Sequence, residues 1–241
     1  MILRQYLHTD PGAISYLFGC AGHAAGAVVD PFGDIAPYLD AAQRAGMRIR
    51  YVVDTHLHAD HLSAGRALAD AAGADYVLFA EAQAALPFRK VRDGDVLDLG
   101  NVSIQVLHTP EHISLLVTDR TRSDEPWFAL TGHTLMAGDL GRTELATNAE
   151  DGARALFHSV QRLEALPDYL EVLPGAYSGS VRGRNLSGKP ASTIGFEKRH
   201  NNAFRIGDEG AFLRLMLSDV PPAPPRAAEM RAINAGIASA A

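Results

Sequence analysis

The sequence has little cysteine and no cluster of positive charge, and each shortage excludes a class of protein. Its single cysteine, Cys20, cannot form a disulfide within the chain, which favours a reducing compartment. Lys and Arg total 22 against 28 Asp and Glu, for a formal charge of −6. Because binding to a phosphate backbone depends on clustered Lys and Arg, no nucleic-acid partner is expected.

Long apolar runs are also missing. No run of about eighteen consecutive apolar residues occurs, so no membrane-spanning helix is predicted. His8, Asp10 and several glycines interrupt the first thirty residues, where a signal peptide would need an unbroken apolar stretch. We therefore predict a soluble, cytoplasmic protein that has no membrane partner.

The sequence does contain enough apolar residues, 47% of 241, for a continuous hydrophobic core. Short apolar or alternating runs predict strands at residues 2–7, 14–18, 26–29, 50–53, 76–79, 95–99, 102–107, 114–118, 127–130 and 170–173. Helical spacing of apolar residues predicts helices at 35–45, 62–72, 150–165, 192–202 and 210–217. Strands and helices mixed in this way predict two sheets covered by helices, rather than one parallel doubly wound sheet.

A proline-rich segment near the C-terminus divides the chain. Pro221, Pro222, Pro224 and Pro225 precede an alanine-rich stretch that predicts a terminal helix. We predict one domain over residues 1–220, followed by a proline-rich joint and a helix over residues 221–241. Exchange of this tail between the subunits of a homo-oligomer is a hypothesis that rests on composition alone.

The residues that carry chemistry follow the strand predicted at 50–53. His56, His58, Asp60 and His61 place three imidazoles and a carboxylate within six residues. Burying these groups without partners is costly, whereas a divalent ion would satisfy them together. The spacing puts the rings of His56 and His58 on one side of an extended turn, and Asp60 and His61 are expected to start the next helix facing the same hollow. A metal site is favoured over a solvated surface cluster.

The segment 56–61, His-Leu-His-Ala-Asp-His, resembles the His-x-His-x-Asp-His signature of the metallo-β-lactamase superfamily. Further blocks follow in the family's order, namely Asp30-Pro31, Thr-Pro-Glu-His at 109–112, Gly-His-Thr-Leu at 132–135, Gly-Arg-Thr-Glu at 141–144 and Leu-Pro-Gly at 173–175. The most similar branch holds the glutathione-linked persulfide dioxygenases and the hydroxyacylglutathione hydrolases. Gly-Arg-Thr-Glu and the block at 192–201 favour the dioxygenases. The resemblance implies an α/β fold, an αββα four-layer sandwich with the metal at one rim of the sheets.

Two departures from the superfamily pattern bear on the number of metal ions. His133 stands where the two-metal hydrolases have a bridging Asp, and Ala176 stands where they have a last His. Without these ligands, two ions about 3.5–4 Å apart are not held together, so one ion per chain is expected. Asp139 offers another way for a carboxylate to reach the site.

Carried over from the persulfide dioxygenases, the resemblance implies one Fe(II) held by His56, His112 and His133. An imidazole in place of the usual carboxylate raises the net charge of such a complex by one unit, which favours anionic thiolates. Three His ligands with an open position equally describe a catalytic zinc. The choice between Fe(II) and Zn(II) therefore stays open, as does the question of whether His58 or Asp139 also binds the metal.

Three functions fit this site. The leading hypothesis is oxidation of a thiol-bound persulfide by O2, with His58, Asp60 and His61 holding the ligands and moving protons. The second is zinc-dependent hydrolysis of a thioester or lactone, with Asp60 as general base. The third is a metal-binding protein without turnover.

Two further residues are predicted to bind the substrate. The forked guanidinium of Arg142 suits a carboxylate of glutathione, although an ion pair with Glu144 or Asp139 fits equally well. Tyr177 begins a segment, residues 177–189, that is longer than in the family and that we expect to reshape the substrate mouth. The expected substrate is a small thiol or thioester, with glutathione as one candidate carrier.

Overall fold

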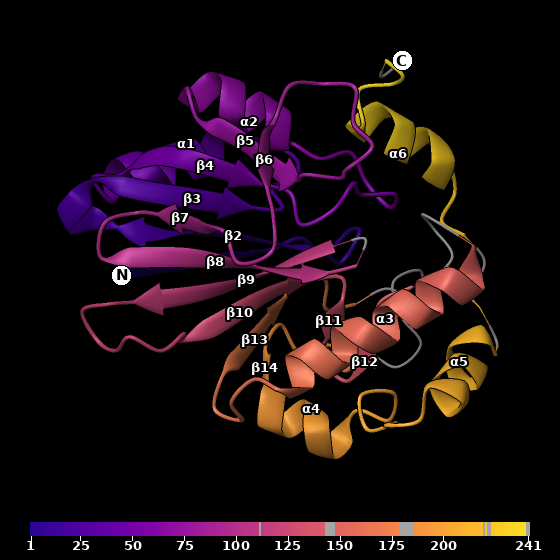
Figure 1. Ribbon diagram of the computed structural model, residues 1–241. Helices are drawn as coiled ribbons and strands as arrows, with labels where there is room; N and C mark the ends of the chain where they lie inside the picture. The colour runs from indigo at the N-terminus through magenta and orange to yellow at the C-terminus, as the bar shows by residue number, and fades with distance from the viewer. Residues whose placement is uncertain (111, 143–147, 179–185, 219, 221–222, 240–241) are drawn as a thin grey trace.

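Two six-stranded sheets lie face to face in the middle of the molecule, and helices cover their outer faces (Figure 1). The computed structural model describes residues 1–110, 112–142, 148–178, 186–218, 220 and 223–239. The predicted αββα four-layer sandwich is confirmed. Within the described parts of the chain, no helix combines the length and the hydrophobicity needed to cross a bilayer.

The first sheet comes from residues 2–91, in the spatial order β1-β2-β3-β4-β5-β6. The pairs β1–β2 and β2–β3 are antiparallel, and the strands from β3 to β6 run parallel. Its strands are β1 (Ile2–Leu7), β2 (Ile14–Cys20), β3 (Ala25–Val29), β4 (Arg48–Val53), β5 (Asp75–Phe79) and β6 (Arg89–Val91). A short 3-10 helix (Ala21–His23) precedes β3, and α1 (Ala36–Arg44) and α2 (Gly65–Ala72) make the crossovers that parallel strands need.

The second sheet has the order β14-β13-β10-β9-β8-β7. Its strands are β7 (Val96–Asp98), β8 (Val102–Thr109), β9 (His112–Asp119), β10 (Phe128–Gly132), β13 (Glu171–Pro174) and β14 (Ser192–Thr193). A separate two-stranded sheet pairs β11 (Leu135–Met136) with β12 (Asp139–Leu140). Three helices lie on the outer face of the six-stranded second sheet, namely α3 (Ala149–Glu164), α4 (Ile194–His200) and α5 (Glu209–Leu217) (Figure 1). The last helix of the described chain is α6 (Ala227–Asn234).

Three apolar layers hold the sandwich together. Between the sheets, the rings of Phe18 and Phe128 meet edge to face with centroids 5.8 Å apart, and Cys20 is buried in the same layer as a small apolar side chain. A second layer joins the second sheet to α3, α4 and α5. A third joins the first sheet to α1 and α2, and it includes Ala235 at the end of α6. The terminal helix therefore packs on the first sheet of its own chain, although it follows α5 in sequence, and the exchange of this tail between subunits stays a prediction.

Short elements escaped the sequence analysis. The strands β6, β11, β12 and β14 were not predicted, because two or three residues are too few for a readable period. The helix predicted at 192–202 is shorter, because Ser192 and Thr193 pair with β13. Thr193 then caps α4, since its hydroxyl accepts a hydrogen bond from the backbone N of Phe196 at 3.1 Å.

One correction concerns the metal-binding motif. The helix predicted at 62–72 begins instead at Gly65, so Asp60 and His61 lie in an irregular loop and do not start a helix. The physical reason is the side chain of Ser63, whose hydroxyl donates to Asp54 at 2.6 Å and accepts from the backbone N of Gly65 at 2.9 Å. These bonds fix the chain in a turn just before the first helical residue.

Gly132 ends β10 where a side chain has no room. Its φ of +51° is in the left-handed region, and a Cβ atom at this position would overlap the hydroxyl of Thr55. The close approach brings the strand end that carries His133 against the loop that carries His56. A glycine therefore lets the two sheets deliver their histidines to one place.

We expect Gly132→Ala to destabilise the fold more than Gly46→Ala. Both positions have a positive φ, so both variants lose roughly 1–2 kcal/mol to the left-handed backbone. Only Gly132→Ala adds overlap with Thr55, which costs roughly 1–3 kcal/mol more, whereas open space surrounds Gly46. Urea unfolding of the two variants measures the difference, and equal losses would contradict the close approach.

Candidate metal centre

Five histidines from three distant segments meet at the ends of the strands. His56, His58 and His61 lie in the loop between β4 and α2, His112 begins β9, and His133 follows β10. The rings of His58, His112 and His133 have centroids 4.1, 4.2 and 4.7 Å from that of His56. The ring of His61 is 4.2 Å from that of His58. Two of the residues predicted as metal ligands, His112 and His133, therefore each lie beside the third, His56.

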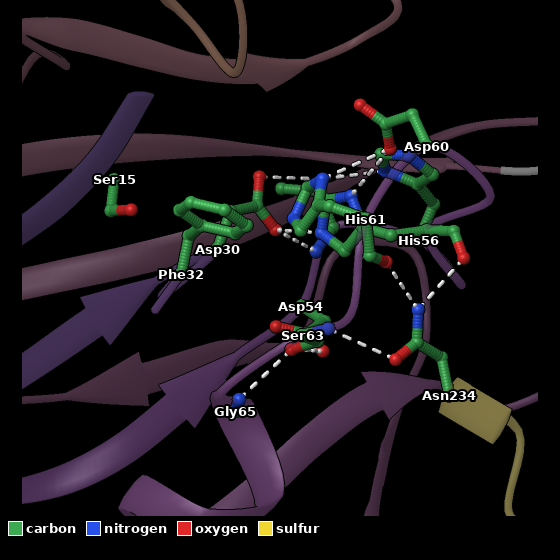
Figure 2. Close-up of polar contacts among 12 residues, drawn as sticks. Ser15, Asp30, Phe32, Asp54, His56, Asp60, His61, Ser63, Gly65 and Asn234 are labelled. Carbon is green, nitrogen blue, oxygen red and sulfur yellow. Dashed lines mark hydrogen bonds and ion pairs between the residues drawn. The ribbon is translucent and has the colours of Figure 1, made fainter. Parts of the chain in front are cut away.

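The loop that carries the motif, residues 54–64, contains no helix or strand and is held by its surroundings. The buried carboxylate of Asp30, just after β3, accepts from the backbone N of Thr55 at 2.7 Å and from its hydroxyl at 2.8 Å. The same carboxylate lies 3.2 Å from Nε2 of His58, and Figure 2 shows Asp30 pointing toward the group of imidazoles that includes His56 and His61. From the second sheet, the backbone N of Ile113 donates to the carbonyl of Thr55 at 2.9 Å. Both sheets thus grip the loop at Thr55.

The hydroxyl of Thr55 decides which nitrogen of His56 faces the site. It donates its one hydrogen to Asp30, so its oxygen is left to accept from Nδ1 of His56, 3.0 Å away. A proton on Nδ1 leaves the lone pair of Nε2 free to bind an ion. Orientation of a ligand ring through its second nitrogen is typical of metal-binding histidines.

Charges around His58 keep its neighbours neutral. Burial alone would lower the pKa of His58, but the hydrogen bond to Asp30 and the charge of that carboxylate, together with Asp60, raise the pKa to about 10. Burial and the positive charge of His58 lower the pKa of His112 to about 4. The same two causes hold the pKa of His56 well below its usual value. Because the neutral ring is the form that binds a metal, His56 and His112 are ready to act as ligands at neutral pH.

The carboxylate of Asp60 lies among these rings. Its Oδ1 is 3.0 Å from Nδ1 of His61 and 3.8 Å from Nδ1 of His58. Burial would raise the pKa of Asp60, but the imidazoles of His133, His58 and His61 hold it well below its usual range. Asp60 is therefore ionised throughout the physiological range and can hold a cation or accept a proton.

The donor atoms fit a metal ion. Ligand atoms of His56, His58 and His133 lie within 4.8 Å of one another, as do those of His58, Asp60 and His61, and those of Asp30, Asp54 and His58. Nδ1 of His58 is buried and, among the described residues, has no partner at hydrogen-bond distance. An ion that used His58 would have to displace its proton, whereas His56 and His112 carry none to displace on the ligating nitrogen.

The other predicted residues lie around the end of β13. A Cβ atom on Gly175 would lie 3.1 Å from Cδ2 of His133, so this strand end borders the imidazoles. The neighbouring Ala176 is fully buried and carries no ligand atom. The backbone N of Tyr177 donates to the carbonyl of Gly12 at 3.1 Å, and its side chain packs against the layer between the sheets. Most of the long segment that follows, residues 179–185, is outside the described residues.

Asp139 and Arg142 follow the β11–β12 turn. The carboxylate of Asp139 is buried and accepts from the backbone N of Leu140 at 2.8 Å. Arg142 is half-buried and directly precedes residues 143–147, which are outside the described residues and include Glu144, the ion-pair partner considered above. The roles proposed for Asp139, Arg142 and Tyr177 stay predictions.

No role was predicted from the sequence for three residues that support the loop. Asp30 was noticed as part of an Asp-Pro pair, but not as the partner of His58. Asp54 accepts from Ser63 at 2.6 Å and from the hydroxyl of Tyr76 at 2.7 Å, and burial raises its pKa to about 6. Asn234 bonds to the loop from a position 173 residues beyond His61, and no sequence pattern signals that contact.

Replacement of Asp30 by Asn tests the support of the loop. The amide removes the negative charge that faces His58 and one of the oxygens that accept from Thr55, and loss of a partner in a buried pair costs roughly 3–5 kcal/mol. Urea unfolding at pH 7 measures the loss. Asp70→Asn, which breaks an exposed ion pair with Arg66, is the control and should cost less than about 0.5 kcal/mol. Similar losses in both variants would show that Asp30 does not hold the loop.

A histidine NMR titration of the metal-free chain tests the charge pattern. We expect His58 to stay protonated up to a pKa of about 10 and His112 to stay neutral down to a pKa of about 4. Because an unfolded His titrates near about 6.5, the stabilisation from His58 is complete below that pH and is lost as the pH rises toward 10. Titration of His58 near its usual value would contradict the proposed partnership with Asp30.

Comparisons with known proteins agree with this geometry. Residues 11–175 match the family model described as the metallo-beta-lactamase superfamily. A hydroxyacylglutathione hydrolase of Rhizobium johnstonii is 33% identical over 142 residues, which are 58% of this chain and 53% of that protein, so the chain spans about half the length of the first curated relatives that it matches. The mitochondrial persulfide dioxygenase ETHE1 of Homo sapiens is 24% identical over 222 residues, covering 90% of this chain and 80% of that protein.

A solved structure extends the likeness to the whole chain. The crystal structure of ETHE1 from Myxococcus xanthus is 28% identical, with a TM-score of 0.84, and the match covers 99% of this chain and 100% of that one. The family match covers more than half of the residues, and it includes the loop with His56, His58 and His61 as well as His112 and His133. The chain belongs to the metallo-beta-lactamase superfamily.

Proposed function

We propose that this chain is a metal-dependent dioxygenase that oxidises a thiol-bound persulfide with O2. The observation that carries the proposal is the extent of the likeness. The human persulfide dioxygenase aligns with 90% of the chain and the Myxococcus xanthus ETHE1 structure with 99%, whereas the alignments with the hydroxyacylglutathione hydrolases of Rhizobium johnstonii and Maricaulis maris cover 58% and 73%. The part of the chain beyond the family match, which includes α4, α5 and α6, is thus shared with the ETHE1 proteins.

The proposed centre holds one Fe(II) through His56, His112 and His133. His56 presents Nε2, because Thr55 occupies Nδ1, and His112 is neutral because burial lowers its pKa. Ala176 supports a single ion, since a methyl group stands where the resemblance places the last histidine of two-metal enzymes. When bound, Fe(II) supplies the redox chemistry that joins dioxygen to the persulfide sulfur.

The surrounding residues bind and orient the substrate and handle protons. Protonated His58 places a positive charge beside the centre, which attracts an anionic persulfide. Because the incoming persulfide is already an anion, Asp60, held ionised and 3.0 Å from His61, is proposed to accept a proton from water. Arg142 and Tyr177 are proposed to bind the thiol carrier, for which glutathione is one candidate.

Zinc-dependent hydrolysis of a thioester or lactone is the second candidate. It is favoured by the all-imidazole donor set, because three His ligands and an open position are typical of catalytic zinc. It is also favoured by the 33% identity to a hydroxyacylglutathione hydrolase. In this case Asp60, ionised and central, is the general base. A metal-binding protein without turnover is the third candidate.

Metal analysis and two assays separate these candidates. The chain is purified after expression in iron-replete medium, and its iron and zinc are measured. Oxygen uptake is then followed with glutathione persulfide, and hydrolysis with a hydroxyacylglutathione thioester. We expect the purified chain to contain iron and to take up oxygen with the persulfide. Zinc without iron, together with thioester hydrolysis, would replace the proposal by the second candidate. A metal-loaded chain that is inactive in both assays would favour the third.

The ligand assignment is tested by a pair of histidine variants. We expect His112→Ala to abolish metal loading, because it removes one of three proposed ligands. We expect His61→Ala to keep the metal and to slow turnover by roughly 10–100-fold, because His61 acts through Asp60. Metal content and oxygen uptake are measured on both variants. Equal loss of metal in the two would contradict the one-metal assignment.

A further inference from the structure

The C-terminal helix reaches back to the metal-binding loop and holds its backbone through one side chain. Asn234, the last residue of α6, donates both hydrogens of its amide group, one to the carbonyl of His58 and one to the carbonyl of His61, each at 2.8 Å. Its Oδ1 accepts from the backbone N of Ser63 at 2.9 Å. Figure 2 shows Asn234 below the loop, on the side away from the ring of Phe32. The amide uses both donors and its acceptor on three backbone groups of one short loop.

These three bonds reach a part of the chain that regular structure does not support. Residues 54–64 form no helix or strand, so their polar backbone groups need other partners. The direction of an imidazole follows from the backbone that carries it, and the carbonyls of His58 and His61 are the ones that Asn234 fixes. Asp30 holds the ring of His58 from the other side, at 3.2 Å from Nε2. Asp30, just after β3, thus holds the start of the loop and the ring of His58, and Asn234 of α6 holds the backbone of residues 58–63.

The helix that carries Asn234 is itself docked on the first half of the chain. Ala235 is buried at 2% exposure, and its carbonyl accepts from the backbone N of Ala85 at 2.7 Å. Gly236 lies against Leu86, since a Cβ atom on this glycine would be 3.1 Å from the leucine side chain. Contacts with two separate segments, 58–63 and 85–86, place Asn234 at the loop.

We propose that Asn234 is a positioning residue of the metal centre, which holds the backbone of residues 58–63 in the conformation that places His58, Asp60 and His61 beside the proposed ligand His56. Docking of α6 and binding of the ion then favour each other. Coupling of this kind is reciprocal, so a helix that raises the metal affinity must itself be held more tightly once the metal is bound. The inference rests on the proposed metal centre and is independent of the reaction that the centre performs.

The first test measures metal affinity in the full chain. Asn234→Asp keeps the shape and still accepts from Ser63, but it turns a carboxylate oxygen toward the two carbonyls; Asn234→Ala removes all three bonds. Glu229→Gln, on the same helix and paired with Arg226, is the matched control. Zn(II) and, without oxygen, Fe(II) are titrated into the metal-free proteins against a chelator. We expect both Asn234 variants to raise the metal Kd about tenfold or more, and the control to stay within about twofold.

Measurements of folding distinguish a positioning role of Asn234 from a role in fold stability alone. Circular dichroism and the unfolding temperature of the metal-free variants are recorded, and the titrations are run where each variant is folded. A purely structural role would lower the unfolding temperature and leave the metal Kd of the folded protein unchanged. That result would overturn the proposal.

The second test needs no variant and therefore decides the matter even if the Asn234 variants do not fold. Hydrogen exchange of the wild-type chain is compared with and without Zn(II). We expect the amides of α6 to exchange more slowly in the loaded protein and those of α5, which packs on the second sheet, to be unchanged. Unchanged exchange in α6 would overturn the proposal. A wild-type chain that binds metal but takes up no oxygen with persulfide would overturn the proposed reaction alone.

Discussion

The metal centre depends on the hydrogen bonds that the buried carboxylate of Asp30 accepts. A buried negative charge needs compensation, and here three donors supply it, namely the backbone and hydroxyl of Thr55 and the ring of His58. Those same bonds set the tautomer of His56 and the charge of His58. One carboxylate, delivered by the end of β3, thus fixes both the shape and the protonation of the motif.

Protonation distinguishes three of the clustered histidines, His56, His58 and His112. Close packing of imidazoles allows few of them to be charged together, because each positive ring lowers the pKa of the next. Asp30 and Asp60 draw the charge onto His58, which leaves His56 and His112 neutral. The arrangement combines neutral nitrogens that can bind an ion with a positive charge beside them, and the proposed persulfide oxidation would use both.

The sequence was sufficient for the architecture and for the set of histidines, but not for what supports them. Long strands and helices have a readable period, so the two covered sheets followed from patterns such as those of β8 and α3. The start of α2 was wrong, because Ser63 and Asp54 fix a turn that local propensity does not reveal. Asn234 could not have been found, since its partners are more than 170 residues away and only the docking of α6 brings them together.

The histidines come from both halves of the sandwich, one group from the loop after β4 and the others from β9 and the end of β10. An ion bound by all three segments is therefore a cross-link between the sheets, added to their apolar packing and to backbone hydrogen bonds such as that from Ile113 to Thr55. During synthesis the chain can acquire such an ion only after residue 133 has left the ribosome. Starvation for the metal would then leave newly made protein easier to open and more exposed to proteases, in addition to leaving it inactive.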